Sequence, residues 1–366
     1  MKVATLFSGI GAFEFALKRM NIKHEIIFAC DNGGIEINYN VDREFKHIKS
    51  LSSWQAQKTY VDKLYEKMTT KTNFVKRSYL ANYNIDESRF FQDIRLFDGT
   101  KFKKDKIDIL VGGSPCQSFS SVGSQFGLED ARGTLFYDFA RIVKETQPKV
   151  FIYENVRGLY NHDKKNTWKG MKEIFKDIGY DFYDAILDSK DFGVPQTRRR
   201  LFVVGFKQSI KGFSFPKPKK LNYKAQDFLL DNLKLGNFSS KKGELSLDFK
   251  KGSYDPKYFL SPKLKAYVMK GGTKSFYQKP EINLPIARTI LSTMGNRHRA
   301  GIDNYYTING RIRMLTEREA HRFMGFTDDY DIVVSRAQGY KQAGNSIVVD
   351  VLIALINSII EKVNIS

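Results

Sequence analysis

Short apolar runs alternate with amphipathic stretches through the first 206 residues, and this alternation constrains the fold more than any other feature. Runs rich in β-branched and aromatic residues predict buried strands. The stretches between them carry apolar residues at helical spacing, as in AFEFALKRM (12–20) and GTLFYDFARIVKET (133–146). Strands that alternate with helices predict an α/β fold, a mostly parallel sheet of the Rossmann-like type. The predicted strands are VATLF (3–7), EIIFAC (25–30), FFQDI (90–94), IDILV (107–111), KVFIY (149–153) and two within 185–206.

The alternation ends after residue 206, where the composition changes. A Pro- and Lys-rich stretch at 215–226 begins a segment of weak periodicity, which predicts short strands and loops. Thr316 and Glu319 then form a capping-box pattern that opens a helix, and a long apolar-striped helix is predicted for 345–364. We therefore expect a large domain of residues 1–207 plus 326–366, with a polar, lysine-rich insertion at 33–75, and a smaller, irregular, β-rich domain of residues 208–325.

The chain is strongly basic, with 60 Lys and Arg against 40 Asp and Glu and a net charge of +20. Residues 207–280 alone carry 17 Lys and Arg against five Asp and Glu, which is more than half of the excess. A basic region that is localised in this way indicates a docking face for a polyanion such as nucleic acid, rather than a uniformly solvated surface.

Cysteine content and hydropathy indicate a cytoplasmic protein. The 366 residues include only Cys30 and Cys116, too few for a disulfide framework or a cluster of metal ligands, so we expect no bound metal. The N-terminal residues lack the pattern of a signal peptide, and no uninterrupted run of about 18 apolar residues predicts a membrane span. We expect a monomer that does not associate with membranes.

The residues that follow the predicted strands converge on one edge of the sheet. In a doubly wound sheet, ligands bind beyond the carboxyl ends of the strands. Each strand end here supplies glycines, a carboxylate or a cysteine, which together predict a ligand-binding or catalytic site. These residues are FSGIG (7–11) after the first strand, Asp31 after the second, Asp93 in the third, GGSPCQ (112–117) after the fourth, and Glu154 with Asn155 after the fifth.

The glycine turn at 7–11 indicates a nucleoside ligand. Glycines let the backbone approach a ligand, and Asp31, twenty residues further on, can bind ribose hydroxyls. A dinucleotide-binding turn would need a third glycine at residue 14, which is Glu14, and its carboxylate would repel a pyrophosphate. A nucleoside with a positive centre, such as S-adenosylmethionine, would tolerate Glu14. The alternative, that these glycines only allow the backbone to turn and bind no ligand, stays open.

Two further groups indicate chemistry at this edge. Cys116 lies on a loop of Gly, Ser and Pro, where a thiolate could act as a nucleophile, whereas Cys30 lies in an apolar run typical of the core. An unpaired carboxylate at the end of an apolar strand is costly to bury, so we expect Glu154 to serve the site. Arg198 and Arg200 lie on one side of a predicted strand, where they could pair with Glu154 or a phosphate. The alternatives are a buried structural cysteine, a helix-capping glutamate and a solvated edge strand.

Six blocks of the sequence, in this order, resemble those of the bacterial and phage DNA cytosine-C5 methyltransferase family. The resemblance covers nearly the whole chain apart from 33–75 and most of 207–285. It implies a sheet of the S-adenosylmethionine-dependent methyltransferase type, with 208–325 as a target recognition domain. The blocks are FSGIGAFE (7–14), SPCQSFS (114–120), ENV (154–156), QTRRRLFVVGF (196–206), RMLTEREAHRFMGF (313–326) and QAGNSIVVDVL (342–352).

The resemblance implies methylation of cytosine in a specific duplex DNA sequence. Cys116 is expected to add to carbon 6 of the base, which makes carbon 5 able to take the methyl group of S-adenosylmethionine and leaves S-adenosylhomocysteine. Glu154 is expected to hydrogen-bond or protonate the ring, and Arg198 and Arg200 complete the cytosine site. Because the base must be reached from both faces, it has to be flipped out of the duplex.

The resemblance also assigns cofactor residues. The family's ribose-binding acid falls on Asp31, although the family usually has a glutamate followed by an aromatic residue and Asn32 follows here. Asp93 and Ile94 correspond to the pair that holds the adenine. The other expected cofactor residues are Phe7, Ser8, Gly9, Gly11, Pro115, Leu135, Asn345 and Ser346.

Two loops are expected to contact DNA. Loop 118–133 is rich in Gly and Ser, which suits a mobile lid over a flipped base, and 291–306 occupies the position of a recognition loop. A cognate restriction endonuclease is a further expected partner. The expected DNA-binding residues are Gln117, Ser120, Ser121 and Gln125 near the lid, and Asn296, Arg297, His298 and Arg299 in the recognition loop.

Three other functions remain open on the sequence. An RNA (tRNA) cytosine-5 methyltransferase of the same fold is the main alternative, and the large basic segment favours duplex DNA over it. A non-catalytic DNA-binding module is disfavoured because Cys116, Glu154 and Asn345 are all present. The hypothesis of a dinucleotide-dependent oxidoreductase is supported by the glycine turn alone, and Glu14 disfavours it.

Overall fold

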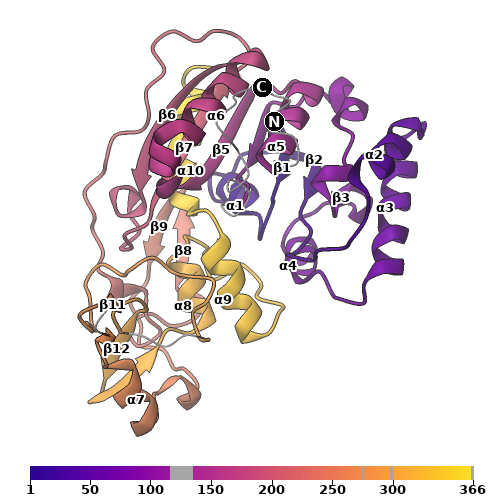
Figure 1. Ribbon diagram of the computed structural model, residues 1–366. Helices are drawn as coiled ribbons and strands as arrows, with labels where there is room; N and C mark the ends of the chain where they lie inside the picture. Colours follow the sequence, from indigo (N-terminus) through magenta and orange to yellow (C-terminus); the bar gives the residue numbers. More distant parts are fainter. Residues whose placement is uncertain (116–134, 274–275, 297–299, 364–366) are drawn as a thin grey trace.

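A seven-stranded sheet forms the centre of the computed structural model, which describes residues 1–115, 135–273, 276–296 and 300–363 (Figure 1). The strand order is β3-β2-β1-β4-β5-β7-β6. The first five of these strands are parallel, and β7 runs antiparallel to both of its neighbours. This topology confirms the predicted α/β, Rossmann-like class. The strands are β1 (Lys2–Leu6), β2 (Glu25–Cys30), β3 (Phe90–Phe91), β4 (Ile109–Gly112), β5 (Val150–Val156), β6 (Asp181–Asp188) and β7 (Arg199–Phe206).

Helices cover both faces of this sheet, because alternate residues of a strand point to opposite faces. Val3 and Ile109 pack with α1 and α10 on one face, whereas Leu110 and Phe151 pack with α5 and α6 on the other. A buried ion pair between Arg19 of α1 and Asp350 of α10, 2.9 Å long, joins the two helices of the first face. These helices are α1 (Ala12–Arg19), α5 (Leu135–Thr146), α6 (Asn166–Asp177) and α10 (Val349–Ile360).

Several strand ends differ from the prediction: β3 ends at Phe91 and not at residue 94, and β6 begins at Asp181, before the predicted 185. β1 ends at Leu6 and not at residue 7, because Phe7 adopts φ +51° and already belongs to the turn. β5 was predicted to stop at residue 153, but it continues to Val156 because β7 pairs with it up to Arg200. Glu154 therefore lies inside β5, close to its carboxyl end, and not after it.

The helix predicted for 345–364 corresponds to α10, which begins four residues later and ends four residues earlier than predicted. α9 (Arg336–Asn345) ends where Ser346 becomes extended, with ψ 159°, and α10 begins only at Val349. The Arg198 guanidinium binds the carbonyl groups of Gly344 and Ser346, which stabilises this break. Within the described part of the chain, Arg336–Ile360 is the one helical segment long and apolar enough to cross a membrane, yet 61% of its most apolar window is buried inside the protein.

The segment predicted as an insertion folds into helices beside the β3 edge of the sheet (Figure 1). We call residues 33–82 the helical insert; its caps are Asn40, Ser53 and Asn73, whose side chains accept hydrogen bonds from the first turn of each helix. Ile48, Val61 and other apolar side chains give the insert a small core of its own. Its helices are α2 (Val41–Ser50), α3 (Trp54–Met68) and α4 (Phe74–Asn82).

The segment after β7 forms short hairpins and short helices, as its weak periodicity predicts. Phe228 and Phe238 pack into the core under the large sheet, whereas Tyr258, Val268 and Met314 belong to a separate core in a smaller lobe. The division of the chain at residue 208 stays a prediction. The elements are β8 (Phe238–Lys241), β9 (Glu244–Leu247), α7 (Pro262–Val268), β10 (Gly272–Thr273), β11 (Phe276–Tyr277), β12 (Tyr305–Ile308), β13 (Arg311–Met314) and α8 (Glu317–Arg322).

A buried cluster of charges anchors the start of α8. Arg313, which has no exposed surface, pairs with Asp231 at 2.6 Å and with Glu319 at 2.7 Å. Glu319 also completes the predicted capping box, since it accepts from the backbone N–H of Thr316 while Thr316 Oγ1 accepts from Glu319 N. The buried Arg313 guanidinium is therefore the counter-charge of both carboxylates, Asp231 and Glu319.

Arg313→Met should lower the free energy of unfolding by about 3–5 kcal/mol, because it leaves two buried carboxylates without their counter-charge. Urea denaturation of the purified protein measures this loss. Arg311→Met is the matched control, since Arg311 lies two residues earlier on β13 but is exposed, and we expect a change of about 1 kcal/mol or less. Equal losses in the two variants would contradict the importance of the cluster.

Candidate active site

A cavity of about 460 Å³ lies at the carboxyl ends of β1, β2, β4 and β5, the edge that the strand-end residues predict. It combines residues that are distant in sequence. The glycine turn after β1 and the loop after β2 line one side, the end of β5 and the arginines near β7 line the other, and α9 and α4 contribute to the wall. The predicted site residues among those lining it are Phe7, Gly9, Asp31, Pro115, Glu154, Arg198, Arg200 and Asn345.

The turn after β1 is closely tied to Asp31. Gly9 N donates to Asp31 Oδ2 at 2.9 Å, and Gly33 N donates to Asp31 Oδ1 at 2.7 Å, so this carboxylate joins two loops that line the cavity. Burial raises the pKa of Asp31, and these two backbone donors partly offset that effect. Gly11 has φ +73°, and a side chain there would come within 2.2 Å of the Tyr83 ring. The turn therefore depends on glycine both for its conformation and for its packing.

Glu154 faces the opposite side of the cavity and pairs with an arginine. Arg200 Nε lies 3.2 Å from Glu154 Oε1, as the sequence predicts for this pair. Burial raises the pKa of Glu154, and the positive charges of Arg200 and Arg198 partly offset that effect. Gly113 is required beside it, because a Cβ there would lie 2.9 Å from Glu154 Oε2. The result is a carboxyl group that holds its proton more readily than an exposed glutamate does.

Asn155 holds the loop that leads from β4 toward Cys116. This side chain is 2% exposed, and its Nδ2 donates at 2.9 Å both to the carbonyl of Ser114 and to the hydroxyl of Tyr153. Ser114 Oγ lies 2.7 Å from the same hydroxyl. The loop is thereby fixed up to Pro115, which lines the cavity, and Cys116 itself lies outside the described residues.

Arg198 is placed differently from the prediction. β7 begins at Arg199, so Arg198 precedes the strand and does not share a strand face with Arg200. Its guanidinium donates to the carbonyls of Ile290 at 3.0 Å, Gly344 at 3.0 Å and Ser346 at 2.8 Å. Burial, together with the charge of Arg200, lowers the pKa of Arg198 to about 9. Arg198 thus joins three segments at the wall of the cavity, while Arg200 alone pairs with Glu154.

The comparisons with known proteins agree with this geometry. A family model described as C-5 cytosine-specific DNA methylase matches residues 1–361. The chain belongs to this family. It is a DNA cytosine-5 methyltransferase. It is 37% identical over 250 residues to the type II methyltransferase M.HhaI of Haemophilus parahaemolyticus, which covers 67% of this chain and 73% of that relative.

Further similarities extend along the whole methyltransferase chain. The type II methyltransferase M.HpaII of Haemophilus parainfluenzae is 33% identical over 383 residues, covering 98% of this chain and 88% of the relative. Among solved structures, S. pombe Dnmt2 methyltransferase matches with a TM-score of 0.65 at 16% identity, over 99% of this chain and 98% of the other. That structural likeness supports the fold.

Several predicted cofactor residues of the methyltransferase do not line the cavity. Ser8 supports the turn from behind, where its Oγ accepts from Cys30 N at 2.9 Å, and Leu135 begins α5. Asp93 is 4% exposed and Ile94 6% exposed, and both lie beneath the site. Glu14 is fully buried and accepts from Thr5 and Tyr79, so it does not face a ligand as its place in the turn suggests. Gly11 and Ser346 are the other two predicted cofactor residues that do not line the cavity.

Sequence reasoning missed part of the cavity wall of the methyltransferase. An apolar residue in the turn or in α4 gives no indication of a chemical role. The polar residues of α9 have the composition of a solvated surface. A search for polar residues near the Gln-Ala-Gly-Asn block could have found the α9 residues. The missed residues include Ile10, Asn32, Gly33, Gly34, Val75, Gln338, Lys341, Gln342 and Gly344.

The residues predicted to contact DNA lie mostly outside the described part of the chain. Asn296 is described; it is exposed, and its backbone N–H donates to Thr293 O. The roles assigned to the others stay predictions. Among the described residues, no group of His, Cys, Asp and Glu could hold a metal ion. The predicted DNA-binding residues outside the described part of the chain are Gln117, Ser120, Ser121, Gln125, Arg297, His298 and Arg299.

Proposed function

We propose that the methyltransferase moves a methyl group from S-adenosylmethionine to carbon 5 of a cytosine flipped out of a specific duplex DNA sequence. One observation carries this proposal. The glycine turn and Asp31 line the same cavity as Glu154, and the loop that leads to Cys116 lines it as well. A nucleoside-binding edge and a base-binding edge thus face one space, as transfer between two bound molecules requires.

The residues present fit S-adenosylmethionine. Each oxygen of Asp31 accepts one backbone N–H and retains a lone pair for a ribose hydroxyl. Phe7 and Val75 offer apolar surface for an adenine, and Asn345 at the end of α9 offers an amide for the amino-acid end. When bound, the cofactor supplies an electrophilic methyl group. Asp93, Ile94 and Leu135 are further proposed cofactor residues, although they do not line the cavity.

The proposed reaction uses side chains on both sides of the base. The Cys116 thiolate adds to carbon 6 of cytosine, and the electron pair of the C5–C6 double bond becomes available at carbon 5. Glu154, whose pKa burial raises, hydrogen-bonds ring N3 through its carboxyl proton and draws charge from the ring. Carbon 5 takes the methyl group, a water molecule removes the carbon 5 proton, and the double bond re-forms as the thiolate leaves.

The proposed partner is duplex DNA, which a chain with a net charge of +20 attracts. The basic residues of 207–280 belong to the proposed target recognition domain, and 291–306 supplies the proposed base-reading loop. The relatives include bacterial proteins named type II methyltransferases. Their names support a cytoplasmic enzyme, proposed to act as a monomer and to protect DNA from a cognate endonuclease.

Purified enzyme with methyl-labelled S-adenosylmethionine should transfer label to duplex DNA and not to tRNA. Bisulfite sequencing of DNA from cells that express the enzyme then identifies the methylated sequence. The physical reason for the preference is the large basic lobe, which offers a duplex many phosphate contacts. Label that appears in tRNA alone would contradict the proposal and favour the RNA alternative.

A further inference from the structure

The helical insert contacts the cofactor side of the cavity at Asp31. Asn73 Nδ2 donates to the carbonyl of Asp31 at 2.9 Å, while Asn73 Oδ1 accepts from Lys76 N and caps α4. Gly33 packs so closely that a side chain there would come within 2.3 Å of Asn73 Oδ1. A single side chain of the insert therefore fixes both the start of α4 and the backbone of the acid proposed to bind ribose.

The same insert contacts Asp93, the second acid proposed for the cofactor. Tyr39 and Tyr65 both donate to Asp93 Oδ2, the latter at 3.0 Å, and Arg95 binds the carboxylate from its other side. Burial and the charge of Asp93 raise the pKa of both tyrosines, so they remain donors at physiological pH. The orientation of this carboxylate is thus set jointly by two hydroxyl groups of the insert and by Arg95, which follows it in sequence.

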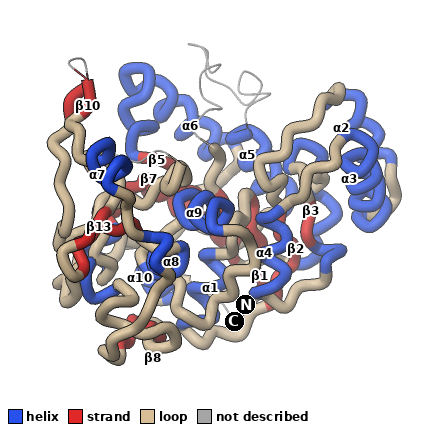
Figure 2. Tube along the Cα trace, turned by 90° about the horizontal axis from the view of Figure 1, so that it is seen from below, coloured by secondary structure: helices blue, strands red, loops and turns tan. Residues whose placement is uncertain are grey.

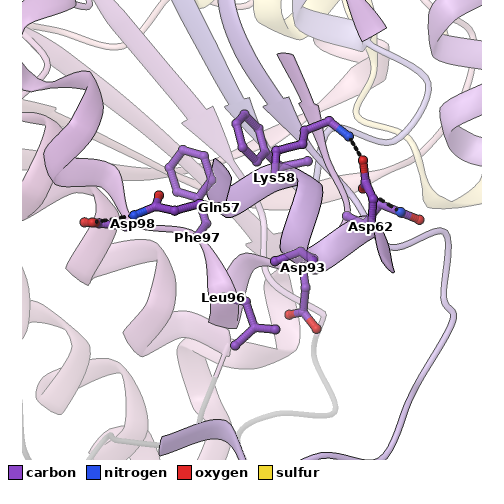
Figure 3. Close-up of a pocket in the computed structure, with 10 residues that line it drawn as sticks. Gln57, Lys58, Asp62, Asp93, Leu96, Phe97 and Asp98 are labelled. Atoms are coloured by element: carbon purple, nitrogen blue, oxygen red, sulfur yellow. Dashed lines mark hydrogen bonds and ion pairs between the residues drawn. The ribbon is translucent and has the colours of Figure 1, made fainter. Parts of the chain in front are cut away.

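Helix α3 reinforces this contact along the segment that carries Asp93. Gln57 donates to Asp98 at 3.1 Å, and Asp62 accepts from Gln92 at 2.9 Å, so polar bonds flank Asp93 on both sides (Figure 3). The space enclosed between α3 and this segment is only about 10 Å³. A contact packed this closely transmits displacements of the insert to the 92–98 segment.

The insert also holds α9, which forms the far wall of the cavity. Gln342 Oε1 accepts from Ser78 Oγ and Gln342 Nε2 donates to the carbonyl of Phe74, both at 2.9 Å. In both overall views α9 lies between α4 and α8 (Figures 1 and 2). Val75, which directly follows Phe74, lines the cavity itself. Through α4, the insert therefore connects the loop after β2 with the helix that carries Asn345.

We propose that the helical insert positions the cofactor half of the active site and thereby sets the affinity for S-adenosylmethionine. Asn73 and Tyr65 are positioning residues, since they act through Asp31 and Asp93. Preorganisation lowers the free-energy cost of binding, because the acids and α9 need not be ordered when the ligand arrives. This inference rests on the proposed function. Among the described residues, no hydrogen bond joins the insert to Glu154 or Arg200, which belong to the base side.

Two matched pairs of variants test the proposal. Asn73→Asp keeps the cap of α4 but loses the donor to Asp31, and Asn40→Asp makes the same change at the cap of α2, which touches neither acid. Tyr65→Phe removes a donor to Asp93, and Tyr60→Phe removes a donor from the same helix to Glu44, a carboxylate remote from the cavity. The pairs separate positioning from simple loss of a hydrogen bond in the insert.

Calorimetry with S-adenosylhomocysteine should show affinity reduced about five- to twentyfold in Asn73→Asp and about three- to tenfold in Tyr65→Phe. Asn40→Asp and Tyr60→Phe should bind as the wild type does, and the affinity of all four for duplex DNA should change by less than about twofold. Equal cofactor affinity in all variants would overturn the inference, as would a loss confined to DNA. Failure of the wild type to bind the ligand would instead overturn the proposed function.

Discussion

Replacing Cys116 by Ser should lower the rate of DNA methylation by at least about a thousandfold, while the binding of S-adenosylhomocysteine and of duplex DNA stays near wild-type values. The reason is chemical: a hydroxyl at neutral pH is a far weaker nucleophile than a thiolate, and without the bond to carbon 6 the ring has too little electron density at carbon 5. Single-turnover transfer of labelled methyl groups measures the effect.

Cys30→Ser is the control for this prediction, since Cys30 is the other cysteine of the chain and is buried in the core of the sheet. It should retain activity to the extent that it folds. A duplex with fluorine at carbon 5 of the target cytosine adds a direct readout, because the fluorine cannot leave as a proton does. The wild type should then form a covalent complex that survives denaturing electrophoresis, and Cys116→Ser should form none. Substantial methylation by Cys116→Ser would exclude the proposed nucleophile.

Glu154→Gln should lower kcat by about a hundred- to ten-thousandfold, the range typical of a lost general acid. Burial raises the pKa of Glu154, so the native carboxyl keeps its proton above the pH at which an exposed glutamate loses it. If that proton serves ring N3, activity is highest while the group is protonated and falls as the pH rises through the raised pKa. A profile of kcat against pH should show this falling limb in the wild type and not in Glu154→Gln, whose amide does not titrate.

Glu244→Gln provides the comparison, because Glu244 is an exposed residue of β9 whose ion-pair partner, Lys219, is also exposed. It should keep both the rate and the pH profile of the wild type. A Glu154→Gln enzyme with normal kcat would show that ring activation does not depend on this carboxyl. A falling limb that persists in Glu154→Gln would assign it to another group.

Local sequence patterns predicted the sheet well. Apolar runs identified its strands, and the pairing of Thr316 with Glu319 predicted the start of α8, because both depend on residues close in sequence. Errors arose where a distant partner decides the structure. β5 extends to Val156 because β7 pairs with it, and α10 begins only at Val349, after an extended Ser346 whose carbonyl binds Arg198. Neither partner can be inferred from the segment itself.

The candidate site was predictable only in part, for a related reason. Strand-end residues such as Asp31 and Glu154 could be placed, because the topology of a doubly wound sheet brings strand ends together. Val75 and Lys341 could not, because their helices reach the cavity through tertiary packing alone. The polar, lysine-rich composition of residues 33–75 suggested a surface insertion and concealed the contacts of Tyr65 with Asp93.

Segments far apart in the sequence contribute to the cavity wall, among them residues 7–34 and residues 338–345. The ion pair between Arg19 and Asp350 makes the same connection beneath the sheet. During synthesis, about 300 residues are added between residue 34 and residue 338, which takes about 15–60 seconds at the usual rate of bacterial translation. The pocket therefore cannot close around residues 7–34 until residues 338–345 have been synthesised and have left the ribosome.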